Sequence, residues 1–299
     1  MSAFETLVDP QAQLTKLARL DTFTEGPVWS PRESCLYFSE IPGDTRWRWT
    51  RERGLEAVAR PCFKGDGLVL DAGGALIASE HVTSSVARIT ADGKREVLAF
   101  HHRGRYLNSP NDVTTRAADG AIYFTDPDFG RWNNAVGVKR DPELAYKGVY
   151  RVPANGGGEA ELLVDESEFD QPNGLCFSPD ERILYVNDSP RAHVKAFPVR
   201  GDGTLGDGHV FFEGIGDGDG RKGAPDGMKC DQHGNVWCTG PGGIWILSPG
   251  GEHLGTLATP EFITNLAWGG PGWRCLFLTG TTSLYSVSTH VASARLPYF

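Results

Sequence analysis

The chain has 299 residues, of which 39% are hydrophobic and 22% are charged, as in globular proteins large enough to bury a sizeable core. Its formal net charge of -9 would repel nucleic acids and anionic membranes, so neither is expected as a partner. No apolar run approaches the roughly 18 residues of a membrane-spanning helix, and no export segment is expected.

Glycine and proline punctuate the whole chain rather than one linker. The 38 glycines and 19 prolines are typical of turns between many short strands, which favours an all-β architecture with residues 1–299 forming one domain. The six cysteines form no C-x-x-C pair, and at least four lie in apolar strand patterns that suit small buried hydrophobes. A reducing cytoplasm is therefore the default expectation for its location.

A hairpin pattern recurs six times along the chain. Each copy begins with a polar residue and a short apolar strand, turns at Gly, Asp or Pro, and returns as a strand rich in β-branched and aromatic residues. In chain order, the copies span residues 25–40, 66–80, 111–126, 173–188, 226–240 and 264–280. A third candidate strand follows each copy, and a fourth usually follows that. Four strands repeated six times predict a six-bladed β-propeller.

The last copy lacks room for a complete fourth strand, because only ten residues follow the third strand at 283–289. The N-terminal segment 12–23 is predicted to supply the outer strand of this last blade, which would close the ring and remove an exposed edge. A β-sandwich, which also contains many short strands, is the alternative architecture. Six copies of one pattern argue against it.

Oxygen-bearing side chains stand first in all six copies. The first strand of each propeller blade lines the central channel, so these residues are expected to converge at one end of the axis. They are Glu25, Asp66, Asn111, Asn173, Asp226 and Thr264. Strand capping is the alternative role for any one of them. A cluster of carboxylates, however, needs compensating positive charge, which a bound cation supplies.

An all-oxygen set without Cys or His favours one hard divalent ion. Ca²⁺ is expected first, Mg²⁺ or Mn²⁺ next, and Zn²⁺ where the geometry permits it. The carboxylates of Glu25 and Asp226, with amide oxygens of Asn173 and Asn111, would neutralise such an ion and leave positions open for water and substrate.

A second polar tier ends the second strand of the first four copies, at Glu40, Glu80, Asp126 and Asp188. Glu80 and Asp126 are expected to contact substrate, and Asp188 to support the ligands. His81, directly after Glu80, is a candidate general base or substrate contact.

Segment 127–147 is much longer than the equivalent loops of the other copies. Loops of this length in compact folds usually act as lids or binding loops. Phe129 and Trp132 in this segment are expected to shield a substrate from water, with simple packing on the rim as the alternative.

Four motifs together resemble the SMP-30/gluconolactonase family of regucalcin-like sugar lactonases, and the likeness covers nearly the whole chain. They are "EGPVW" at Glu25, "SPNDV" at Asn111, "QPNGL" at Asn173 and "PDGMKCD" at Asp226. The resemblance implies a six-bladed propeller that hydrolyses a lactone with one divalent metal on its axis. It implies Glu25, Asn173 and Asp226 as ligands, Asn111 as a further ligand or substrate contact, and Asp226 as a candidate general base.

Animal-type members carry an arginine two residues before the axial asparagine, where this chain has Ser109. Arg105 is expected to take over the contact with sugar hydroxyls if its loop folds inward. The predicted reaction is attack of water on the lactone carbonyl with Asp226 as the base, and metal-bound hydroxide is the alternative nucleophile. Two other functions stay open: a phosphotriester or fluorophosphate hydrolase, and a non-catalytic binding propeller with a structural ion.

Overall fold

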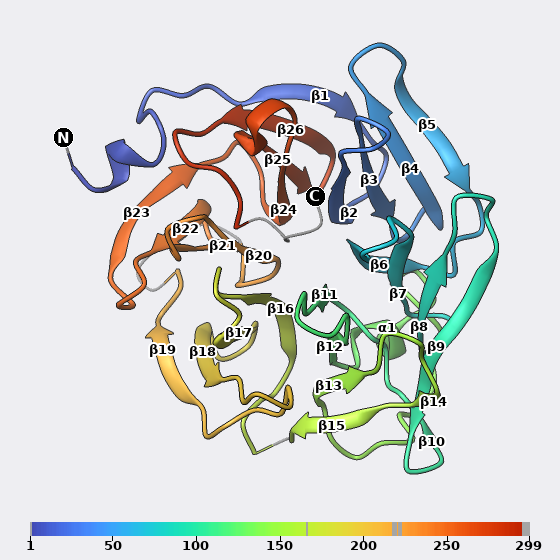
Figure 1. Cartoon of the computed structure of the whole chain (residues 1–299). Helices are drawn as coiled ribbons and strands as arrows, with labels where there is room; N and C mark the ends of the chain where they lie inside the picture. The colour runs from blue at the N-terminus through green and yellow to red at the C-terminus, as the bar shows by residue number, and fades with distance from the viewer. Residues whose placement is uncertain (1, 166, 217–219, 221–222, 295–299) are drawn as a thin grey trace.

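Six β-sheets stand around a common central axis in the computed structural model (Figure 1). The structure describes residues 2–165, 167–216, 220 and 223–294. Each predicted hairpin forms the first two strands of one blade, and the predicted six-bladed propeller is confirmed.

The blades follow one another along the chain, and the first strand of each lies nearest the axis (Figure 1). Blade 1 contains β2 (Thr24–Ser30), β3 (Cys35–Glu40), β4 (Thr45–Thr50) and β5 (Gly54–Ala59). Blade 2 contains β6 (Gly65–Leu70), β7 (Leu76–Glu80), β8 (Ser85–Ile89) and β9 (Arg95–His102), with β10 (Arg105–Tyr106) and β14 (Gly158–Glu159) paired to β9. Blade 3 contains β11 (Val113–Thr115), β12 (Ile122–Asp126), β13 (Gly148–Val152) and β15 (Glu161–Val164).

The second half of the ring repeats this plan. Blade 4 contains β16 (Pro172–Phe177), β17 (Ile183–Asp188), β18 (His193–Pro198) and β19 (His209–Glu213). Blade 5 contains β20 (Met228–Cys230), β21 (Val236–Gly240), β22 (Gly243–Leu247) and β23 (His253–Ala258). Blade 6 contains β24 (Ile263–Gly269), β25 (Cys275–Gly280), β26 (Ser283–Ser288) and β1 (Thr15–Arg19). The helical segments are short: η1 (Phe4–Thr6), α1 (Phe129–Trp132) and η2 (Pro271–Trp273).

The N-terminal strand closes the ring, as the sequence predicts. β1 pairs antiparallel with β26, and Figure 1 shows the blue β1 along the outside of the red strands of this blade. Leu7 and Val8, which precede β1, are buried in the apolar cluster that blades 5 and 6 share. The outer edge of the last blade is therefore covered by the chain's own first strand.

Apolar side chains of facing sheets fill the space between neighbouring blades. Trp237 of blade 5 and Trp268 of blade 6, for example, pack edge to face with ring centroids 5.1 Å apart. All six cysteines are free thiols, and the cytoplasmic location stays a prediction. Among the described residues, none of the helices has the length and apolarity needed to cross a bilayer.

Candidate metal centre and active site

The first strands of the blades run in the same direction along the channel, so their first residues meet at one end. Backbone hydrogen bonds join neighbouring first strands there. The Gly67 amide donates to the Asn111 carbonyl over 2.9 Å, and the Gly227 amide donates to the Thr264 carbonyl over 2.7 Å. This end of the channel is therefore narrow, and the side chains beside these bonds converge.

Irregular pairing at the start of the first strands directs these side chains. The register of the β2–β3 ladder shifts between Glu25 and Val28, and the β16–β17 ladder shifts between Pro172 and Leu175. Such bulges re-aim a side chain and bend the strand. We call the first residue of each hairpin copy its axial residue. In blade 4 the glycine after the axial residue lets blade 5 approach, because a Cβ on Gly174 would overlap the carbonyl oxygen of Asp226.

A ring of side-chain donors fixes the backbone of the axial residues. In each of these bonds the donor is the side chain that precedes the second-tier residue of one blade. The acceptor is the backbone carbonyl of the axial residue of the next blade. The bonds run from Ser39 to Asp66 (3.0 Å), from Ser79 to Asn111, from Thr125 to Asn173 (2.7 Å), from Asn187 to Asp226 (2.5 Å) and from Thr239 to Thr264 (3.4 Å). Blades 1 to 5 thus each position the site residue of the next blade.

Three carboxyl groups interact unfavourably at this end of the channel. Burial raises the pKa of Glu25 well above its usual range, and the nearby carboxylates of Asp226 and Asp66 raise it further. Burial also raises the pKa of Asp226 and of Asp66, and the Asp66 carboxylate adds to the rise at Asp226. The described side chains around these carboxyl groups therefore do not supply enough positive charge to keep all three ionised.

Asn173 presents an unsatisfied oxygen beside these acids. Its side-chain amide donates to Ser189 Oγ over 3.0 Å, while its Oδ1 atom is buried and has no hydrogen-bond partner in the described part of the chain. Glu25 is held through Oε2, which accepts from Asn265 Nδ2 and the Gly26 amide, both over 2.9 Å. An amide oxygen without a donor, next to repelling carboxylates, suits a hard cation.

The composition of the cluster decides what could hold a metal. Within residues 2–165, 167–216, 220 and 223–294, His, Cys, Asp and Glu side chains nowhere form a group of three or more placed to hold one. A metal here would need the amide oxygen of Asn173 beside the carboxylates of Glu25 and Asp226. Asp226 is only partly buried, so the cluster keeps access from the mouth of the channel.

Asp66 takes part in a hydrogen-bonded chain instead of standing alone. Its Oδ2 accepts from Asn111 Nδ2 over 2.7 Å and lies 2.9 Å from His81 Nε2. His81 Nδ1 lies 2.7 Å from the Val136 carbonyl, which can only accept, so Nδ1 carries a proton. The predicted role of His81 as a general base or substrate contact stays a prediction.

Comparisons with known proteins agree with this geometry. A sequence model of the SMP-30/Gluconolactonase/LRE-like region matches residues 23–282. The chain belongs to this family. Lactone hydrolysis is the reaction that membership supports.

Individual relatives are similar over most of their length. The solved gluconolactonase of Xanthomonas campestris is 32% identical with a TM-score of 0.88, over 97% of this chain and 93% of that one. The gluconolactonase of Zymomonas mobilis is 28% identical over 95% of this chain and 83% of its own length. The 6-deoxy-6-sulfogluconolactonase of Pseudomonas putida is 29% identical over 86% and 82%.

The second-tier acids of this lactonase-family chain have partners within the protein, and the expectation that Glu80 and Asp126 contact substrate stays a prediction. Glu80 is 1% exposed, and Arg95 binds both its oxygens at 2.6 to 3.1 Å. Asp126 accepts the Asn108 amide over 2.8 Å, at the segment that enters β11, the first strand of its own blade. Asp188 accepts the Asp170 amide in the same way, over 2.5 Å. Asp126 and Asp188 thus hold the entry segments of their own blades.

Arg105 lies on an outer strand, and its expected contact with substrate stays a prediction that this position does not favour. It belongs to β10, the outermost strand of the blade 2 sheet, whose order is β10-β9-β8-β7-β6 (Figure 1). Its side chain is exposed and donates to the Glu143 carbonyl over 3.0 Å. Ser109, at the position of the family's arginine, is occupied as well, because it donates to the Pro127 carbonyl and accepts the Gly130 amide.

Segment 127–147 covers His81 and flanks the axial site. Its Gly130 is packed so tightly on Ser109 and His81 that a Cβ there would overlap both. Phe129 and Trp132 form an edge-to-face pair with centroids 4.9 Å apart, and Trp132 is 55% exposed. Their role in shielding a substrate stays a prediction.

Two residues near the axis escape the sequence reasoning. Asn265, and not Thr264, supports Glu25, because the Thr264 hydroxyl donates to the Thr24 carbonyl over 2.5 Å. Asp112, directly after Asn111, adds to the rise in the pKa of Asp226 and lies 3.6 Å from Lys229 Nζ. Two features of the sequence could have indicated these residues: Asn265 follows Thr264 directly, and Asp112 stands where four other copies have glycine.

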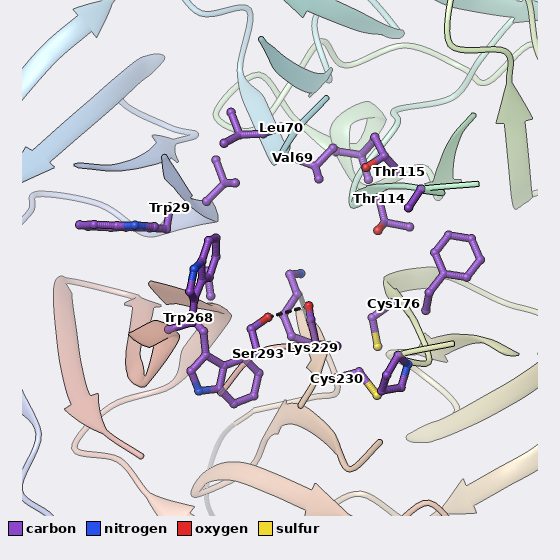
Figure 2. A pocket seen from close by; sticks show the side chains of 18 of the residues that line it. Trp29, Val69, Leu70, Thr114, Thr115, Cys176, Lys229, Cys230, Trp268 and Ser293 are labelled. Atoms are coloured by element: carbon purple, nitrogen blue, oxygen red, sulfur yellow. Dashed lines mark hydrogen bonds between the residues drawn. The ribbon is translucent and has the colours of Figure 1, made fainter. Parts of the chain in front are cut away.

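The opposite end of the channel opens into a separate cavity of about 360 Å³. Figure 2 shows Trp29, Trp268 and Cys176 around it, at the last residues of the first strands. Its lining is largely apolar and contains none of the oxygen ligands described above. The cavity is therefore distinct from the candidate metal centre.

Proposed function

We propose that this protein is a divalent-metal-dependent hydrolase that opens the ring of a small lactone. The observation that carries the proposal is the buried, unpartnered oxygen of Asn173 beside acids that raise one another's pKa. The reactions named for the gluconolactonase relatives of Xanthomonas and Zymomonas support lactone hydrolysis as the chemistry of this site.

Glu25, Asn173 and Asp226 would hold the metal, with Asn111 as a further ligand or substrate contact. The all-oxygen set favours Ca²⁺, with Mg²⁺, Mn²⁺ and Zn²⁺ as alternatives. A bound divalent ion supplies a Lewis acid for the lactone carbonyl and positive charge against the oxyanion.

The chain's own residues would orient the reactants and move the proton. Asp226, at the open mouth of the cluster, accepts a proton from the water that attacks the carbonyl carbon. The ring C–O bond then breaks, the departing alkoxide takes the proton back from Asp226, and the new carboxylic acid ionises to give a hydroxycarboxylate. Asn111, whose amide is held by Asp66, is placed to orient an oxygen of the substrate.

The decisive experiment is hydrolysis of a lactone panel by chelated protein, followed with a pH indicator. Activity should be absent after chelation and return with one of Ca²⁺, Mg²⁺, Mn²⁺ or Zn²⁺. Glu25→Gln and Asp226→Asn should each abolish this recovery and the metal-induced rise in melting temperature. Asp180→Asn, which changes an acid at the opposite cavity, should leave both unchanged.

Three outcomes oppose the proposal. Full activity in both variants would refute the assigned ligands. Metal-restored cleavage of a phosphotriester without any lactone turnover would favour the phosphotriesterase alternative. Metal binding without turnover of any substrate in the panel would favour a propeller whose ion is structural.

A further inference from the structure

A buried arginine between blades 1 and 2 lacks a partner. Arg46, at the start of β4, is 4% exposed, and its Nε and Nη2 atoms are buried with no hydrogen-bond partner among the described residues. Its Nη2 lies near Gly65, the first residue of β6, where a Cβ would stand 3.5 Å from it. The guanidinium stays charged in proteins, so this site contains a positive charge of which two nitrogens lack an acceptor among the described residues.

This guanidinium lines a cavity of about 260 Å³ between the two blades. Phe63, Leu76 and Ile89 supply much of the apolar lining, and Val58 at the rim is 41% exposed. The cavity therefore opens toward the outside of the ring. It is separate from the channel that holds the candidate metal centre.

Burial lowers the pKa of Arg46, and its neighbours Cys62 and Glu80 oppose this only in part. Glu80 is bound by Arg95 through both carboxylate oxygens, and the Arg95 guanidinium also lies over the Phe63 ring at 4.8 Å. Burial raises the pKa of the Cys62 thiol to about 11, so this neighbour is neutral at physiological pH. At the rim, Glu33 accepts the Tyr37 hydroxyl over 2.7 Å and lies 3.7 Å from Arg48.

A buried, unpaired guanidinium is costly, and a planar oxyanion is the partner that its fork fits best. We infer that the cavity between blades 1 and 2 is a binding site for a small organic carboxylate, with its anionic group on Arg46 and its apolar body on Phe63, Leu76 and Ile89. The site goes beyond the proposed lactone hydrolysis.

The shape of the cavity limits the ligand class. Its volume of about 260 Å³ favours a compact molecule. The apolar wall opposite Arg46 disfavours the polyhydroxylated acid that opening of a sugar lactone would release, because its hydroxyls would lose water without gaining partners. An aromatic or short branched aliphatic carboxylate satisfies both surfaces.

Thermal unfolding with matched ligands tests the inference. Benzoate and the uncharged benzamide have nearly the same size and body, so their difference isolates the contact with Arg46. Benzoate at ten times its dissociation constant should raise the melting temperature by about 2–4 °C at constant ionic strength, whereas benzamide should not.

Variants locate the effect. Arg46→Gln should remove the benzoate response and keep lactone turnover, whereas Arg46→Lys should weaken the response at least tenfold, because a point charge replaces the fork. Arg48→Gln, two residues along the same strand and paired with Glu56 at the surface, is the matched control and should retain the full response.

Crystallography tests the position of the ligand. Crystals soaked in 4-bromobenzoate should show an anomalous bromine signal near Phe63, and this signal should be absent from Arg46→Gln crystals. This measurement also applies if a variant folds poorly in solution. An equal response to benzamide, a full response in Arg46→Gln, or no response of the unaltered protein at 50 mM benzoate would each overturn the inference. A response to inorganic phosphate alone would overturn the carboxylate class.

Discussion

Asp126 should make the stability of this propeller depend on pH in a direction opposite to that of a surface carboxylate. Its side chain is buried, its Oδ2 accepts the Asn108 amide over 2.8 Å, and its Oδ1 has no hydrogen-bond partner among the described residues. Burial raises the pKa of Asp126 from 3.8 to about 7, although the Asn108 and Ser109 amides oppose the rise.

The sign follows from proton binding in the two states. Between pH 4 and pH 7, the folded chain keeps Asp126 protonated while the unfolded chain ionises it, so folding is favoured by protons. The free energy of unfolding therefore decreases as pH rises through this window and is constant above it. A rise from 3.8 to about 7 corresponds to about 4 kcal/mol, at about 1.4 kcal/mol per pH unit.

Urea unfolding of the native protein and of Asp126→Asn, measured from pH 4 to pH 8, isolates this group. The asparagine does not titrate, and the contributions of Glu25, Asp66 and Asp226 cancel in the difference. The native protein should lose about 4 kcal/mol relative to the variant as pH rises from 4 to 8. Asp92→Asn is the control, because Thr90 and the Lys94 amide lower the pKa of Asp92.

A difference between native protein and Asp126→Asn that stays constant across this range would refute the reasoning. It would mean that Asp126 is ionised in the folded chain, with a counter-charge at Oδ1. A native protein that gains stability relative to Asp126→Asn as pH rises would also refute it, because the pKa of Asp126 would then be lowered by folding.

Three further predictions test the ring and the site. Thr125→Val removes the hydroxyl that bonds the Asn173 carbonyl over 2.7 Å. It should lower the free energy of unfolding in urea by about 1–3 kcal/mol and weaken metal binding. The control variant Thr114→Val on β11 should change this free energy by less than about 0.5 kcal/mol. Deletion of residues 1–20 removes β1 and the buried Leu7 and Val8. It should lower the free energy of unfolding by roughly 5 kcal/mol or more and prevent cooperative thermal unfolding. A truncated chain with an unchanged melting temperature would disprove the closure, and deletion of residues 1–3 serves as control. Arg105→Ala should leave kcat/KM for lactones within twofold, because the side chain lies on the outer strand; a tenfold loss would restore it to the site.

Much of the axial site could be predicted because the repeat itself carries the information. The six hairpins set the blades, and a residue that opens each first strand must lie at the same end of the channel. The donor ring was also visible in principle, since a hydroxyl or amide residue stands before every second-tier position, from Ser39 to Thr279. Its partners were not visible, because each bond joins residues of different blades.

The second-tier acids show where this reasoning fails. Glu80 and Asp126 occupy equivalent places in the repeat, yet one pairs with Arg95 and the other holds a backbone amide. Loop conformation decides which partner reaches each carboxylate, and it is not encoded in strand periodicity. Arg105 shows the same limit, since two added residues of pairing on β9 direct it outward.

The sequence by itself determined the ring, its closure by the first strand, and the identity of the oxygen donors at the mouth, because these follow from a repeated local pattern of strands and turns. Only the tertiary structure decided which of those oxygens remains without a donor, that His81 lies beside Asp66, and that two nitrogens of the buried Arg46 lack an acceptor among the described residues. These properties depend on which side chains of different blades come within hydrogen-bonding distance, and packing between sheets sets those distances.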